Sequence, residues 1–102
     1  MKKQIMALVA ASALIVSANA VAAGDAAAGK AKAAACGACH GATGTSMAPN
    51  FPNLKGQKDA YMVKQLKAFR SGDRKDPMMA PMAKPLTDAD IDNLAAYYSS
   101  MK

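Results

Sequence analysis

The chain has 102 residues, of which 52% are hydrophobic and 5% aromatic, and its formal net charge is +6. A chain this short has room for one small domain at most, and such domains usually need a metal, a cofactor or cross-links for stability. The composition excludes a multidomain enzyme, a coiled coil, a repeat array and, with only two cysteines, a disulfide-rich scaffold.

The first two dozen residues have the pattern of an export signal. Two lysines form a basic start, an apolar stretch follows, and small residues come next. We therefore predict a cleavable signal peptide over residues 1–22 and a mature domain over residues 23–102. Cleavage after Ala22 fits best, with Ala20 and Ala23 as alternatives. The prediction implies a periplasmic protein whose mature form has no membrane span, because the strongly apolar part is too short for one.

Apolar spacing predicts three helices and no strand. The first is expected over residues 25–35, which are rich in alanine and can be capped by Asp25. The second is expected over residues 59–71, and the third begins after Thr87, which can cap it. The apolar stripes of the last two helices comprise Met62, Leu66 and Phe69, and Ile91, Leu94, Ala95 and Tyr98.

Two segments between these helices are expected to be irregular loops. Residues 41–56 contain three glycines and two prolines, and residues 73–85 contain three prolines; these residue types interrupt regular structure. Three short helices with few large apolar residues and two long loops would make a poor core. The difficulty disappears if a large, flat, apolar group fills the centre and the loops wrap around it.

The most specific motif is CGACH, from Cys36 to His40. CxxCH is the attachment signature of c-type haem. Its two thiols form thioethers with the vinyl groups at one porphyrin edge, and the next residue places an imidazole on the iron. A structural zinc site would need four ligands, and His40 is the only histidine. We predict one covalently bound haem c per chain, held by Cys36 and Cys39, with His40 as the proximal ligand.

A second axial ligand cannot be another histidine, which leaves a methionine thioether, a lysine amine or an open position. Met78, Met79 and Met82 fall in one five-residue window before the last helix. A thioether ligand would favour ferrous iron and raise the reduction potential. The alternative role, in which a methionine only covers the haem edge, is expected for two of the three.

From residue 24 to 101 the chain resembles the small monohaem class I cytochromes c, in particular a single cytochrome c4 domain or a short cytochrome c553. The segments that carry the resemblance are GDAAAGK, CGACHG, APNFPNLKGQ, AYMVKQLKAFRSGDR, MMAPM and LTDADIDNLAAYYSS. The resemblance implies an all-α class I cytochrome c fold, with three to five helices wrapped around one covalently bound haem.

The resemblance also implies further site residues. The distal methionine of relatives stands eight residues before the cap of the last helix, which here is Met79, with Met78 and Met82 as fallbacks. A proline carbonyl accepts the N–H of the proximal imidazole in relatives; Pro49 fits that position, and Pro52 is the alternative.

One glycine is expected at a helix crossing. Gly29 matches the small residue at which the first helix of relatives crosses the last, and Leu94 and Tyr97 are expected opposite it.

The function implied by the resemblance is that of a soluble, monomeric electron carrier, not an enzyme. Expected partners are acidic redox proteins, with a quinol-oxidising complex as donor and a terminal oxidase or reductase as acceptor. Nucleic acid is not an expected partner, because the lysines are scattered along the chain. Two alternatives remain open: an electron-transfer subunit of a periplasmic dehydrogenase, and a ligand-binding haem enzyme or sensor.

Overall fold

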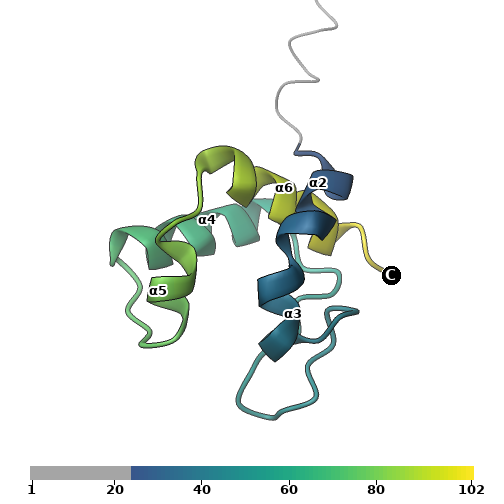
Figure 1. Cartoon of the computed structure of the whole chain (residues 1–102), viewed down its shortest axis with the longest axis horizontal. Coiled ribbons are helices and arrows are strands. Elements are labelled where there is room, and N and C mark those ends of the chain that lie inside the picture. The colour runs from purple at the N-terminus through teal and green to yellow at the C-terminus, as the bar shows by residue number, and fades with distance from the viewer. Residues whose placement is uncertain (1–23) are drawn as a thin grey trace, which may run out of the picture.

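The computed structural model describes residues 24–102, which contain five helices and no strand (Figure 1). In chain order they are α2 (Ala26–Lys32), α3 (Ala34–His40), α4 (Asp59–Ser71), α5 (Met79–Ala83) and α6 (Asp88–Ser99). The all-α prediction is confirmed. The predicted signal peptide over residues 1–22, with its candidate cleavage positions, lies outside the described residues. No helix within residues 24–102 is long and apolar enough to cross a membrane.

Two helices start at the caps that the sequence predicts. The Asp25 carboxylate accepts hydrogen bonds from the first backbone N–H groups of α2, at 2.9 and 3.3 Å. At α6, Thr87 and Asp90 form a reciprocal capping box, each side chain accepting from the other's backbone N–H at 3.0 Å. Caps of this kind stabilise a helix by about 1 kcal/mol each.

Two expectations about helix boundaries were wrong. The first helix is divided at Ala33 into α2 and α3. The segment over residues 73–85, expected to be a loop, contains the short helix α5. Pro81 does not interrupt this helix. It stands in the first turn of α5, where a backbone N–H has no partner within the helix.

Helix α2 crosses α6 at Gly29, as the resemblance implies. A Cβ atom on Gly29 would overlap the backbone carbonyl of Asn93 and would lie 2.8 Å from Tyr97 Cβ. The backbone of Asn93 and the expected Tyr97 therefore lie nearest to Gly29 at the crossing. The Asn93 side chain also accepts a hydrogen bond from the Asp25 N–H at 2.8 Å, which fixes the start of α2 to α6.

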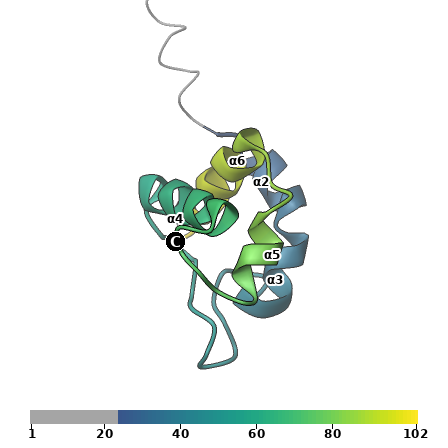
Figure 2. The ribbon, with the colours of Figure 1, turned by 90° about the vertical axis from the view of Figure 1, so that its left-hand side faces the viewer.

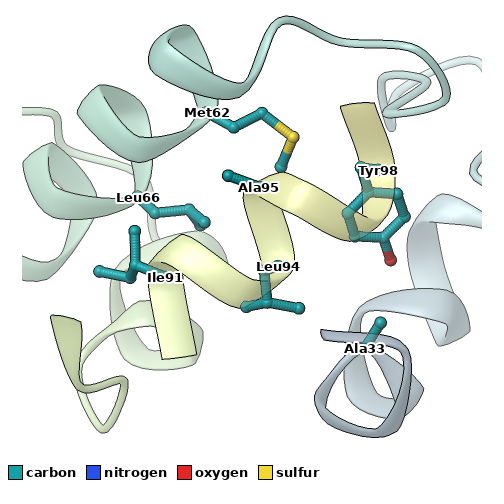
Figure 3. Close-up of a cluster of buried hydrophobic side chains, with 7 residues drawn as sticks. All are labelled: Ala33, Met62, Leu66, Ile91, Leu94, Ala95 and Tyr98. Atoms are coloured by element: carbon teal, nitrogen blue, oxygen red, sulfur yellow. The ribbon is translucent and has the colours of Figure 1, made fainter. Parts of the chain in front are cut away.

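The core is a small cluster between α4, α6 and the end of α2 (Figure 3). Its members are Ala33, Met62, Leu66, Ile91, Leu94, Ala95 and Tyr98. Several apolar side chains at its margin, among them Leu54, Met79 and Leu86, are only partly buried. Both α3 and α5 extend to the same side of the α4–α6 pair, and Figure 2 shows them from a second direction.

Candidate functional site

Helix α3 carries all three residues of the CxxCH motif. Cys36 and Cys39 are three residues apart and His40 follows Cys36 by four, so the three side chains leave one face of the helix. The helix ends directly after His40, because Gly41 has a φ of +87°, which disfavours any residue with a side chain. Both thiols are free.

The ring of His40 is buried and held in one orientation. Its exposed fraction is 6%, and its Nδ1 donates a hydrogen bond to the backbone carbonyl of Pro52 at 2.8 Å. The ring also packs edge-on against Phe51, with centroids 6.4 Å apart. Because Nδ1 carries the proton, the lone pair of Nε2 is left for a metal ion, which is the form in which histidine ligates iron.

The carbonyl that orients His40 belongs to Pro52, and the preference for Pro49 was wrong. Residues 48–51 form a turn closed by a hydrogen bond of 3.2 Å, which places Pro49 at the tip of the loop. Asn53 accepts a bond from the Ser46 N–H at 2.7 Å and ties the two arms of the loop together. Pro52 lies on the returning arm, beside the histidine.

The sulfur of Cys36 lies near Tyr98 of α6. Burial raises the pKa of the Cys36 thiol, and a hydrogen bond from the Tyr98 hydroxyl partly opposes that rise. Burial also raises the pKa of Tyr98, so that both groups are neutral near pH 7. The sequence identified Tyr98 only as a core residue, and its periodic position on α6 carries no signal of the contact with cysteine.

The three candidate distal methionines differ in burial. Met78 is 53% and Met82 45% exposed, whereas Met79 is partly buried and packs against the core cluster. Asp76 lies shortly before α5, and its carboxylate accepts backbone hydrogen bonds from Met78 and Met79, where the helix begins. These two bonds are the main cause of the lowered pKa of Asp76. Sequence reasoning missed Asp76, although an aspartate just before a helix is a common cap.

The far end of the methionine segment is attached to α4 by Arg70. Its guanidinium donates to the backbone carbonyl of Leu86 at 3.0 Å and to the carboxylate of Asp88 at 2.7 Å. Arg70 is the main cause of the lowered pKa of Asp88. The segment that carries Met79 is thus held at both ends by side chains.

The residues of the site suit a haem c. The donor set comprises two free thiols on one helical face, an imidazole with its Nε2 lone pair available, and a half-buried thioether on another helix. The half-buried apolar side chains at the margin of the core suit a flat apolar group. Within residues 24–102, no three histidine, cysteine or acidic side chains gather closely enough to hold a metal ion by themselves.

Comparison with known proteins matches residues 26–102 to the family described as "Cytochrome c". Cytochrome c4 of Pseudomonas aeruginosa is 53% identical over 81 residues, which cover 79% of this chain and 40% of that relative. Cytochrome c-554(548) of Halomonas halodenitrificans is 51% identical over 83 residues, covering 78% of this chain and 100% of the relative.

A solved structure and a further relative are also similar to this chain. The structure of reduced recombinant cytochrome c4 from Pseudomonas stutzeri is 48% identical with a TM-score of 0.74, covering 78% of this chain and 47% of that one. A thiosulfate dehydrogenase electron acceptor from Thiomonas intermedia is 44% identical over 72 residues, 70% of this chain and 33% of the relative. The match spans 40% of the Pseudomonas aeruginosa cytochrome c4 but all of the Halomonas protein.

Proposed function

Because the chain belongs to the cytochrome c family, we propose that it is a periplasmic electron carrier with one haem c ligated by His40 and Met79, and not an enzyme. The observation that carries the proposal is the pairing of a buried, oriented imidazole on α3 with the one inward-packed methionine of α5. When bound, the haem supplies a ferric/ferrous couple that exchanges single electrons.

Each residue of the site has a distinct role in the proposal. Cys36 and Cys39 would hold the haem through thioethers, and the single CxxCH motif corresponds to one haem per chain. The Pro52 carbonyl keeps the proton of His40 on Nδ1, which fixes the ring and strengthens donation from Nε2. The soft thioether of Met79 would favour the reduced iron. With His40 and Met79 both holding the iron, no position would be left for a substrate.

The charge of the domain favours acidic redox partners. The net charge of +6 falls to +4 when the two lysines of the predicted signal peptide are removed. Such a surface steers an oppositely charged protein and gives association rates that fall with salt. We propose a monomer that takes electrons from a quinol-oxidising complex and passes them to a terminal oxidase or reductase.

A second candidate function is that of a dedicated electron-transfer partner of one periplasmic dehydrogenase. The similarity to a protein named thiosulfate dehydrogenase electron acceptor favours it. Affinity purification from the native periplasm at high salt distinguishes the two functions. A dehydrogenase that stays bound supports the dedicated partner, whereas release supports the freely diffusing carrier.

The near-infrared absorption of the exported ferric protein tests the axial ligands. We expect the weak sulfur-to-iron charge-transfer band of a His/Met haem. Met79→Leu should abolish the band, while the matched controls Met78→Leu and Met82→Leu should retain it. A high-spin spectrum without the band would contradict the proposal and favour a haem enzyme or sensor with open iron. Absence of haem after maturation in a competent host would contradict haem attachment itself.

A further inference from the structure

We propose that Asp76 is a positioning residue for the distal ligand: its carboxylate holds the backbone that presents Met79, and this keeps the iron closed to outside ligands. The inference rests on the proposed function, in which Met79 is that ligand.

Asp76 accepts hydrogen bonds from three consecutive backbone N–H groups, those of the residue before α5 and of its first two residues. Its Oδ1 accepts hydrogen bonds from the N–H groups of Met78 and Met79, each at 2.8 Å. Its own backbone carbonyl accepts from the Ala80 N–H at 3.0 Å. The first N–H groups of a helix have no partner within it, so the carboxylate provides acceptors that the helix itself lacks.

The size of α5 makes this cap important for its position. Helix α5 has only five residues, Met79–Ala83, and so short a helix is unstable without external contacts. Its first residue is the proposed ligand, so the Asp76 bonds act directly on the backbone that carries the thioether. Removing the carboxylate takes away two of the three bonds and leaves the Ala80 bond in place.

Loosening this backbone should weaken the proposed bond between Met79 and the iron most in the ferric protein. A thioether is a soft ligand and binds ferric iron less well than ferrous iron. An outside ligand binds only the fraction of molecules in which the methionine has left the iron. Its apparent affinity therefore rises in proportion to that open fraction.

Imidazole titration of the ferric holoprotein, followed by absorbance, measures this fraction. Asp76→Ala should bind imidazole about fivefold more tightly than the wild type, the factor that corresponds to loss of a typical helix cap. Asp76→Asn retains an acceptor oxygen and should stay within about twofold of the wild type. Asp73→Ala is the matched control, because it removes the same charge from the same segment, and within residues 24–102 the Asp73 carboxylate accepts no hydrogen bond.

A second measurement does not depend on an added ligand. Hydrogen exchange of the Met78 and Met79 amides in the ferrous protein should be faster in Asp76→Ala than in the wild type and unchanged in Asp73→Ala. In the ferrous state the methionine stays bound, so this readout reports the cap itself.

Three results would overturn the inference. They are unchanged imidazole affinity in Asp76→Ala, an equal effect of Asp73→Ala, and an Asn variant that behaves like the Ala variant. Absence of the sulfur-to-iron band from the wild type is a different result. It would overturn the Met79 assignment and the inference with it, so the two failures are distinguishable.

Discussion

The two helices that carry the proposed iron ligands, α3 and α5, position these residues by different means. On α3 the three functional residues lie within five positions of one helix, and local helical geometry alone puts them on one face. On α5 the proposed ligand, Met79, comes from a five-residue helix that Asp76 contacts at one end and Arg70 at the other. The placement on α3 can therefore be predicted from residue spacing, whereas Met79 was singled out by the family resemblance and its inward packing is seen only in the tertiary structure.

The largest effect is expected when both cysteines of α3, which would attach the haem covalently, are replaced. The double variant Cys36→Ser, Cys39→Ser should lose most of its helical far-ultraviolet signal. The reason is that the core cluster is small and its margin half-exposed, so the chain depends on the haem to complete it. A compact, helical double variant without haem would contradict this dependence.

Gly29→Val tests the scaffold from which α3 extends. The new side chain would meet the backbone of α6 at the helix crossing, where Asn93 and Tyr97 leave no space. We expect destabilisation of about 1–3 kcal/mol or more, as for other overpacked contacts, measured by denaturant unfolding of the holoprotein. Ala28→Val is the control for a branched side chain in the same helix, because Ala28 is exposed on α2.

Arg70→Met tests whether Arg70 attaches the segment that carries α5 to α4. The methionine side chain keeps much of the apolar part of the arginine side chain. The pKa of Asp88 lies below its ordinary value mainly because of the hydrogen bond from Arg70, so it should rise in the variant. A carboxyl with a lowered pKa contributes stability above its ordinary pKa and loses it as the pH falls through the lowered value. The stability of Arg70→Met should therefore decline less than that of the wild type on acidification.

The measurement for Arg70→Met is an NMR titration of the Asp88 carboxyl together with unfolding at several acidic pH values. Asp90 is the internal control, because its lowered pKa has Thr87 as main cause and should not change. An unchanged pKa of Asp88 would show that the Arg70 contact is not formed in solution.

The smallest effect is expected at Met47, which follows the haem motif but is 98% exposed. Met47→Leu should change the free energy of unfolding by less than about 0.5 kcal/mol. It should also leave the near-infrared band intact. Loss of the band would identify Met47 as the distal ligand and remove the contrast between α3 and α5.

Much of the fold follows from short-range patterns. The periodic positions of Leu66 and Ile91 predicted the core faces of α4 and α6, and Asp25 and Thr87 predicted two helix starts. The exceptions are the division of the first helix at Ala33 and the helix α5, where proline was interpreted as a helix breaker although it stands in the first turn.

The sequence by itself determined the haem motif, since the spacing of Cys36, Cys39 and His40 brings them together on any helix. Only the tertiary structure decided that Pro52 orients the histidine and that Met79, among the three candidates, packs inward. The physical reason is that these positions depend on contacts between residues far apart in the sequence. The return path of the loop that carries Pro52, for example, is fixed in part by the hydrogen bond from the Gly56 N–H to the Tyr98 carbonyl. No local pattern specifies where such a segment comes to lie.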